Sequence, residues 1–397
     1  MKDLSRIQNI VIVYMENRSF DHLIGYLNMP GNHPRWQDIH GITEALNYYA
    51  GSQYRPHPLT AQNIDPDPPH ERENVDLQIN SVGKPMNGFA DSYAKAFPHA
   101  RPDAVMEYCG PKDLYVTDPL SRNFLICDRW HACLPASTLP NRLMAMSGYA
   151  LVDHTPNGYI DYAKDLFYNH PDDLVYDWLE SRGISWRLYY SGSFFFMQMP
   201  RILGKYEKDV SLQNTFRPLH RLIDDFRNGD VTQITFIEPL YYDDYRRNNQ
   251  QATDDHSPAP LTGGQRFLKM VWEAVKSPGI WENLLFVLSY DEHGSIFDHV
   301  MPPPIPTNPP PQATYTSGFK TLGVRVPGIV ISPFVEPGSV CSELFDHTSV
   351  LKLLGEKFGG GKYSAFVDGR AVHSLSETLS DALLLPNAPI RNAPDEP

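Results

Sequence analysis

Short apolar runs that stop at polar residues recur along the chain. Four of them, rich in Val, Ile, Leu and Phe, span residues 9–17, 234–239, 284–294 and 328–333. Apolar runs without alternation are typical of strands buried on both faces, as in a sheet that helices cover. Another strand-like run lies at 184–190. The pattern therefore predicts several buried strands spread over most of the chain.

Segments with helical periodicity separate these runs. In 260–277, one helical face collects the apolar residues Phe267, Met270, Val271, Ala274 and Val275. Thr262 and Gln265 have the spacing of a capping box at the start of this segment. Further helical patterns occupy 171–183, 217–229 and 346–361. This alternation predicts an α/β fold with a central, mostly parallel sheet covered by helices.

Two segments do not fit the alternation and are predicted to be long loop insertions. Residues 28–110 are rich in Pro, Asn, His and Tyr and form a loop-rich insertion over the strand ends. Residues 301–318 form a Pro-rich loop. Long ordered loops inside a compact domain are often lids or pocket walls, with plain surface decoration as the alternative.

Acidic and amide side chains follow directly on two of the predicted strands. Glu16 and Asn17 end the first strand, and Asp291 and Glu292 end the strand that begins near residue 284. Open sheets of this class bind ligands at the carboxyl ends of their strands. Adjacent carboxylates repel unless a cation lies between them, and oxygen ligands suit Mg²⁺, Ca²⁺ or Mn²⁺, with Zn²⁺ if histidine joins. The alternative is that these residues cap helices or lie in solvated loops.

Hydroxyl, arginine and histidine side chains complete the candidate chemistry. Thr138 precedes Pro-Asn-Arg142 at the start of a possible helix, where a hydroxyl and helix N–H groups can face an anion and an arginine can clamp phosphate oxygens. Here the alternative is an N-cap at Ser137 or Thr138 and a surface charge at Arg142. Three histidines lie in polar, Pro-flanked loops, where they can hold a phosphoryl group, protonate a leaving oxygen or be structural: His70, His256 and His299. Asp255 either orients His256 or binds metal directly.

Charge and hydropathy exclude some partners. The formal net charge of −13 argues against non-specific nucleic-acid binding and against docking on anionic lipid, but not against a neutral lipid or a small phosphate ester. We find neither an apolar run long enough for stable membrane insertion nor a signal-peptide pattern, so we expect a cytoplasmic protein, or a secreted or periplasmic one if this is a processed form. Cys127 and Cys133 either bridge or stay free, and the oligomeric state is open.

Five motifs in order carry a family resemblance. They are ENRSFDH at 16–22, TLPNR at 138–142, DDHSP at 254–258, DEHGSIFDHV at 291–300 and GVRVPGIVISP at 323–333. Together they resemble the motif set of the phosphoesterase family, which contains bacterial and plant non-specific phospholipases C and a respiratory-burst-inhibiting type of acid phosphatase. The resemblance covers residues 9 to about 358. It implies an alkaline phosphatase-like sandwich and a single phosphoesterase catalytic domain over residues 1–397.

The resemblance also implies roles for individual residues. Thr138 is the expected nucleophile, forming a phosphothreonine intermediate. One divalent metal ion is expected on Glu16, Asn17, Asp291 and Glu292. The phosphoryl group is expected to lie among His70, His256 and His299, one of which protonates the leaving alcohol. The loop at 67–79, followed by 83–89, is similar to the family's insertion and places His70 at its active-site histidine. Arg325 is interpreted as a structural anchor, and Asp346 and His347 as a helix start.

The expected activity is metal-dependent, phospholipase C-like hydrolysis of a small-molecule or lipid phosphate ester. The alternatives are an acid phosphatase that acts on phosphomonoesters, and a phosphate-binding relative without turnover. The chain departs from the family where two glycines are usual, because it has Gly294 and Ser295. Many bacterial relatives also carry an export signal and further β-rich domains, and this sequence shows neither. The chain therefore departs from the family in the backbone beside the expected metal and in the segments that would engage a membrane.

Overall fold

The structure is a computed structural model that describes residues 2–32, 36, 39–80, 85–155, 173–192, 215–242, 252–390 and 394–396. An eight-stranded sheet forms its centre, in the order β12-β6-β11-β10-β1-β9-β7-β8. Its strands are β1 (Asn9–Met15), β6 (Leu125–Cys127), β7 (Trp186–Tyr190), β8 (Phe216–Pro218), β9 (Ile234–Ile237), β10 (Leu284–Tyr290), β11 (Gly328–Ile331) and β12 (Val340–Cys341). All neighbouring strands pair in parallel except β11, which is antiparallel to both of its neighbours. The predicted mostly parallel sheet is confirmed.

The predicted apolar runs form the middle of this sheet. The four runs correspond to β1, β9, β10 and β11, and the run at 184–190 contains β7. Every residue of β9, β10 and β11 is buried, and so is every residue of β1 after Asn9. These strands are apolar at nearly every position because helices cover both of their faces.

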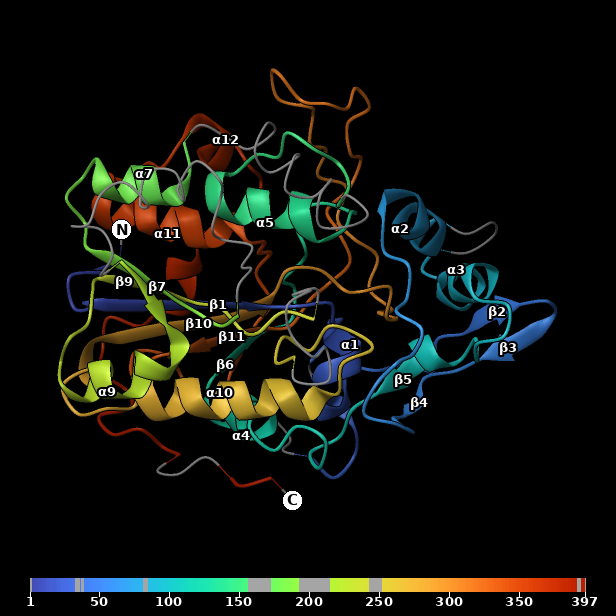
Figure 1. The fold of residues 1–397 in the computed structure, drawn as a ribbon, viewed down its shortest axis with the longest axis horizontal. Helices are drawn as coiled ribbons and strands as arrows, with labels where there is room; N and C mark the ends of the chain where they lie inside the picture. The colour runs from blue at the N-terminus through green and yellow to red at the C-terminus, as the bar shows by residue number, and fades with distance from the viewer. Residues whose placement is uncertain are drawn as a thin grey trace.

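Helices cover both faces of the sheet (Figure 1). One layer contains α5 (Thr138–Ser147), α7 (Val175–Glu180), α11 (Thr348–Phe358) and α12 (Ala365–Asp368), and the other contains α4 (Thr117–Asn123), α9 (Leu222–Arg227) and α10 (Leu261–Val275). Short 3₁₀ turns occur at η1 (Gly25–Asn28), η3 (Ala104–Met106), η5 (Leu219–Arg221), η7 (Trp281–Asn283) and η8 (Leu375–Thr378). The α/β sandwich predicted from the sequence is therefore observed.

The capping box predicted for α10 is wrong. The helix follows Pro260, and no side chain caps its first turn. Gln265 instead reaches across to α4, where its Oε1 accepts from the N–H groups of Val116 and Thr117, both at 3.0 Å. Gln265 is fully buried, so it serves the start of a neighbouring helix rather than its own.

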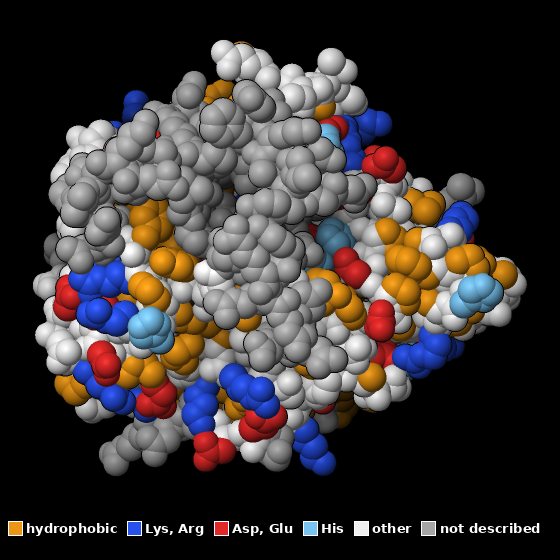
Figure 2. Space-filling model, viewed as in Figure 1, with side chains coloured by type: hydrophobic (Ala, Val, Ile, Leu, Met, Phe, Trp, Pro, Cys, Tyr) orange, Lys and Arg blue, Asp and Glu red, His pale blue; other side chains and the backbone are white. Residues whose placement is uncertain are grey.

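The insertion is more ordered than its composition suggests. It follows α1 (Phe20–Leu23) and contains α2 (Arg72–Ile79) and α3 (Phe89–Ala96). It also contains two short strand pairs, β2 (Asn47–Tyr49) with β3 (Ser52–Tyr54) and β4 (His57–Pro58) with β5 (Glu107–Tyr108). A separate apolar cluster of α2, α3 and η3 residues packs with Ile296, Phe297 and Val324 of the main body. In Figure 1 the insertion lies at the right of the sheet. In Figure 2, acidic and histidine side chains are visible where the insertion meets the main body.

Three further predictions can be compared with the structure. The loop 301–318 projects away from the sheet (orange, top of Figure 1) and is tied back by the Thr307–Phe319 bridge. Cys127 and Cys133 are buried free thiols, and Cys127 lies opposite Cys341 in the β6–β12 pair. Within the part of the chain that the structure describes, we find no helix that combines the length and apolarity needed to cross a bilayer.

Candidate active site

Two neighbouring strands deliver the predicted metal ligands to one place. β1 and β10 are parallel and in register up to Met15 and Tyr290, so the residues that follow them leave the sheet side by side. Backbone hydrogen bonds continue the pairing, from Asp291 N–H to Met15 O at 3.0 Å and from Arg18 N–H to Glu292 O at 3.1 Å. The predicted proximity of the two acidic segments is therefore observed, and it follows from strand register.

A third segment, after β9, joins them. Glu16 N–H donates to Asp254 O at 2.9 Å, and Asp254 Oδ1 accepts from His256 N–H at 3.1 Å. These bonds place the His256 ring beside Glu16, with 3.9 Å between Nδ1 and Oε2. Asp255, which follows Asp254, points elsewhere, because its Oδ2 accepts from the Tyr290 hydroxyl at 2.7 Å. Asp254 rather than Asp255 therefore holds the backbone of His256, and the carboxylate that contacts its imidazole is that of Asp67.

Oxygen atoms of Asn17, Glu16 and Glu292 converge. One end of the Asn17 amide lies 2.5 Å from Glu292 Oε1 and 3.2 Å from Glu16 Oε2. With the amide oxygen at that end, three oxygens meet, which is favourable around a cation or when one of the two carboxyl groups carries a proton. With the amide turned, its nitrogen donates to both carboxylates and its oxygen accepts from His256 Nε2 at 2.8 Å. The donor set fits a hard divalent cation in the first orientation and is satisfied without one in the second.

The fourth predicted ligand, Asp291, is turned toward the protein interior. Its Oδ1 accepts from the N–H groups of Asn17 at 3.2 Å and Glu292 at 2.8 Å, and its Oδ2 accepts from Arg142 Nε at 3.2 Å. Its backbone oxygen accepts from His347 Nε2 at 2.7 Å. Asp291 therefore organises the turn after β10, and both of its carboxylate oxygens contact the turn or Arg142.

Arg142 differs from both sequence interpretations. It is buried, with 1% of its surface exposed, so it is not a surface charge. Its Nη2 contacts Glu16 Oε1 at 2.7 Å and the backbone oxygens of Tyr14 and Met15, and its Nε contacts Asp291. A guanidinium that holds two carboxylates and two carbonyls is directed into the protein rather than at a phosphate. We therefore replace the predicted phosphate clamp by an arginine that neutralises the acidic site.

Thr138 faces the same carboxylates. It is the first residue of α5, and its Oγ1 lies 3.4 Å from Glu16 Oε2. The preceding turn is held by Asn141, which bonds to Leu134, Ala136 and Ser137 through its side-chain amide. Thr155 Oγ1 accepts from Leu139 N–H at 2.8 Å and caps the helix from outside. Thr138 is thus not needed as a cap, and its hydroxyl is directed at the site.

The insertion contributes His70 and, next to it, two acidic residues. His70 Nδ1 donates to Pro68 O at 2.7 Å, and Nε2 lies 3.7 Å from Glu292 Oε1. Asp67 Oδ2 lies 3.2 Å from His256 Nε2, so Asp67, His70 and His256 form one group. Glu71 accepts from the Ser137 hydroxyl at 2.7 Å, which holds this loop against the residue before Thr138. Sequence reasoning missed Asp67, although its position three residues before His70 was a usable signal.

Burial and mutual repulsion raise the pKa of two carboxyl groups. The pKa of Glu16 is well above its ordinary value, chiefly because Glu16 is buried and also because Asp291 is close, while Arg142 and His256 oppose the change. Burial likewise raises the pKa of Glu292 to about 8, against the opposing effect of His70. For His70, burial alone lowers the pKa, but the Glu292 and Asp67 carboxylates outweigh it and the pKa is raised. A bound cation would favour the charged carboxylates.

The turn after Glu292 accommodates the departure from two glycines. Gly294 and Ser295 both have left-handed backbones, with φ of +59° and +58°. A Cβ on Gly294 would lie 2.5 Å from the backbone oxygen of Asn17, so this position requires glycine. Ser295 has the conformation that glycine prefers and uses its hydroxyl to contact Pro69 O and Gln78 Nε2. The backbone therefore keeps a left-handed turn despite the serine.

His299 belongs to a different group. Its Nδ1 and its backbone N–H contact Asp21 Oδ2 at 2.7 and 2.9 Å. Arg325 is fully buried between Asp21 and Asp298, which agrees with its interpretation as an anchor. No contact among the described residues links His299 to Thr138 or to Glu16. We therefore remove His299 from the candidate catalytic set, because its imidazole is held by a separate carboxylate.

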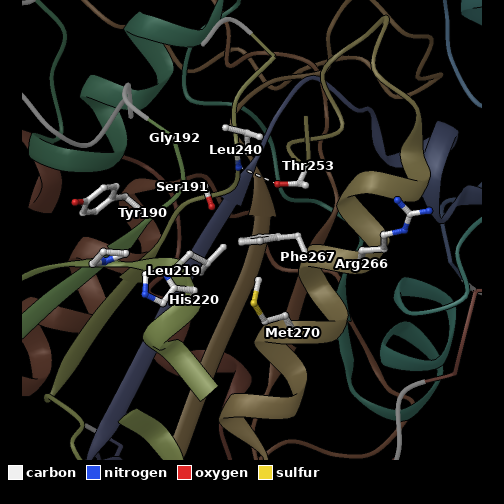
Figure 3. A pocket seen from close by; sticks show the side chains of 11 residues that line it. Tyr190, Ser191, Gly192, Leu219, His220, Leu240, Thr253, Arg266, Phe267 and Met270 are labelled. Atoms are coloured by element: carbon white, nitrogen blue, oxygen red, sulfur yellow. Dashed lines mark hydrogen bonds between the residues drawn. The ribbon is translucent and has the colours of Figure 1, made fainter. Parts of the chain in front are cut away.

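A cavity of about 600 Å³ lies beside the site between β7, η5 and α10 (Figure 3). Leu219, Phe267 and Met270 form its apolar wall, and the Leu240 N–H donates to Thr253 Oγ1 at 2.8 Å at its upper end. Within the described ranges, none of the predicted catalytic or metal-binding residues lines it. The cavity is therefore distinct from the acidic site, although Thr253 precedes the Asp254–His256 segment.

Comparisons with known proteins agree with the motif set. A family model described as Phosphoesterase family matches residues 7–359. The chain is 31% identical over 396 residues to Non-specific phospholipase C3 of Arabidopsis thaliana, covering 89% of this chain and 70% of that protein. It is 29% identical over 377 residues to Non-specific phospholipase C6 of the same plant, covering 87% and 67%. A solved protein in the alkaline phosphatase superfamily from Vibrio parahaemolyticus is 12% identical with a TM-score of 0.38, covering 68% of this chain and 65% of that one. Since the family model spans most of the sequence, the chain belongs to the phosphoesterase family.

Proposed function

We propose that the protein is a metal-dependent phosphoesterase of the phospholipase C type that works through a phosphothreonine intermediate. Hydrolysis of phosphate esters follows from family membership, whereas the metal, the intermediate and the diester preference are proposals. The observation that carries them is the Thr138 hydroxyl, 3.4 Å from a Glu16 carboxylate that converges with Asn17 and Glu292. A nucleophile beside an oxygen-rich donor set is the arrangement that metal-assisted phosphoryl transfer needs.

Glu16, Asn17 and Glu292 would hold the metal ion, with Asp291 as the fourth proposed ligand. When bound, the ion lowers the pKa of a neighbouring hydroxyl and neutralises charge on phosphoryl oxygens. Ca²⁺, Mg²⁺ and Mn²⁺ suit these oxygen donors, and Zn²⁺ suits them if His70 or His256 takes part. Arg142 keeps Glu16 and Asp291 close together despite their repulsion.

The chemical steps use the protein's own residues. Thr138 Oγ1 attacks phosphorus and loses its proton toward Glu16, the carboxylate that it contacts. His256, held by Asp67 and the Asp254 backbone contact, or His70, held by Pro68, protonates the departing alcohol oxygen. Water then attacks the phosphothreonine and the same histidine accepts the proton of the water, while the bond between phosphorus and Thr138 Oγ1 breaks and Glu16 returns its proton to that oxygen. The products are the alcohol and a phosphate or phosphorylated head group.

The site favours diesters over monoesters. A monoester dianion needs more cationic contact than a diester monoanion, and Arg142 directs its contacts to Glu16 and Asp291. The names of the plant relatives point the same way. A monoester-specific acid phosphatase and a phosphate-binding protein without turnover are the two alternatives.

Chromogenic diester and monoester substrates, each with and without a chelator, separate these possibilities. We expect faster release from the diester, abolished by chelation and restored by a divalent cation. Preferred hydrolysis of the monoester would favour the phosphatase, and no release from either would favour the binding protein.

Thr138→Ala tests the intermediate. Only a hydroxyl is lost, so we expect the fold to remain and turnover to fall by about 10³-fold or more. Acid quenching of the wild-type protein during turnover should trap one phosphoryl group on the peptide that contains Thr138, detected by mass spectrometry. Near-normal hydrolysis by Thr138→Ala, or a phosphoryl group on another residue, would contradict the assignment.

A further inference from the structure

Ser295 adopts an unfavourable backbone conformation and uses its side chain in an unusual place. Its φ of +58° is one that glycine adopts freely and serine does not. Its hydroxyl is buried, donates to the backbone oxygen of Pro69 and accepts from Gln78 Nε2. Pro69 immediately precedes His70, so the hydroxyl connects the turn after Glu292 directly to the loop that carries the histidine.

Gln78 completes this connection from α2. It is fully buried, and its Nε2 also lies 3.3 Å from Pro69 O and 3.3 Å from Ser92 Oγ. Its Oε1 accepts from His293 Nε2 at 2.8 Å. One amide therefore joins the His70 loop, α3 and the turn that contains Glu292, His293 and Ser295.

These contacts close a ring around the gap between His70 and Glu292. The ring runs from Glu292 along the backbone to Ser295, through its hydroxyl to Pro69, and along the backbone to His70. His70 Nε2 lies 3.7 Å from Glu292 Oε1, which closes the ring. Among the described residues, Ser295 and Gln78 make the contacts that join Pro69 to this turn. They therefore set the separation of His70 from Glu292 together with the Asp67–His256 and Glu71–Ser137 contacts, which hold the same loop from its other side.

We propose that Ser295 and Gln78 are positioning residues that hold His70 at its working distance from the Glu292 side of the active site. We name this pair the Gln78–Ser295 latch. Neither residue touches the site of phosphoryl transfer, and both act through the Pro69–His70 segment. This inference rests on the proposed function for the role of His70, while the geometry of the latch stands independently of it.

The variant Ser295→Gly gives a clean test. Glycine relieves the left-handed backbone, which offsets part of the loss of the buried hydroxyl contacts, so the protein should still fold. Ser295→Ala is the second variant, since it keeps the Cβ. Ser332→Ala is a matched control, because Ser332 is also buried, donates to Leu284 O at 2.6 Å and accepts from Phe334 N–H at 3.2 Å at the far end of β10.

We expect Ser295→Gly to lower kcat by about tenfold with KM within about twofold of the wild type, because a misplaced catalytic group slows the chemical step more than binding. Bound metal, measured by elemental analysis, should be unchanged. In a His70→Ala background the same substitution should have less than about a twofold effect on kcat, since the group that it positions is absent. Ser332→Ala should leave kcat unchanged.

Three results would overturn the inference. One is an equal loss of kcat from Ser295→Gly in both backgrounds, another is loss of metal, and the third is wild-type kcat in both Ser295 variants. Hydrogen exchange provides a readout that needs no activity: the backbone amides of His70, Glu71 and Arg72 should exchange faster in Ser295→Gly than in the wild type and in Ser332→Ala. If the wild-type protein hydrolyses no phosphate ester, the proposed function fails, and unchanged exchange in this loop is what would exclude the latch.

Discussion

Arg142 shows how a single residue can stabilise a site that would otherwise repel itself. Glu16 and Asp291 are both almost fully buried, and the guanidinium contacts each of them. Removing one partner of a buried ion pair leaves an uncompensated charge, which costs more than the pair contributes. The sequence alone shows that Arg142 lies one helical turn after Thr138. The direction in which the Arg142 side chain points could not be predicted, because it depends on how α5 packs against the end of β1.

Arg142→Met should therefore destabilise the metal-free protein by about 3–5 kcal/mol, measured by denaturant unfolding. Added divalent cation should recover part of the loss, because it supplies positive charge to the same carboxylates. Arg55→Met is the control, since Arg55 pairs with Glu44 at 2.6 Å on the exposed surface and its loss should change the unfolding free energy very little. Equal behaviour of the two variants would contradict the role given to Arg142.

At the scale of elements, the site depends on the turn that follows β10. Strand runs at 9–17 and 284–294 were predictable because continuous apolar sequence specifies a strand buried on both faces. Their adjacency was an expectation of the fold class, and register then brought Glu16 and Glu292 together. The bridge from Gln265 to α4 and the order within the insertion were not predictable, since both depend on partners far away in sequence.

Gly294→Ala tests this turn. The added Cβ would lie 2.5 Å from the Asn17 oxygen and 2.6 Å from the Asn17 Cβ, so the two ligand segments must move apart. We expect a loss of about 2–4 kcal/mol in unfolding free energy, together with weaker metal binding.

Gly279→Ala is the matched control for that substitution. Gly279 also has a positive φ, +82°, but a Cβ there meets nothing within 4 Å. It should cost only about 1–2 kcal/mol from the backbone and leave metal binding intact. Unaltered metal affinity in Gly294→Ala, measured by titration calorimetry, would show that the turn does not control the ligand geometry.

At the scale of the whole molecule, protonation of the acidic site would couple folding to the proposed metal binding. The pKa of Glu292 rises from 4.5 to about 8 in the folded protein, and that of Glu16 is also raised. At pH values between 4.5 and about 8, Glu292 keeps its proton in the metal-free folded protein but has released it in the unfolded chain. Unfolding then releases protons, so stability is greatest below the unfolded-state pKa and falls as pH rises through the folded-state pKa.

We therefore expect the Tm of the metal-free protein to fall between about pH 5 and about pH 8, and a saturating divalent cation to flatten that slope. Glu292→Gln removes one of the titrating groups and should flatten the slope without metal. Differential scanning calorimetry across this range is the measurement. A Tm that rises with pH in the metal-free protein would show that these carboxyl groups are already ionised in the folded state.

The register between β1 and β10 has a consequence for biosynthesis. Asn17 and Asp291 stand 274 positions apart, yet their atoms are hydrogen-bonded, so the N-terminal half of the ligand set has no partners while the chain is still emerging from the ribosome. Capture of the cation would have to wait for the second strand, and premature termination before that point would yield products unable to retain it. A chain that retains the metal would therefore be one in which β10 has been synthesised and has paired with β1.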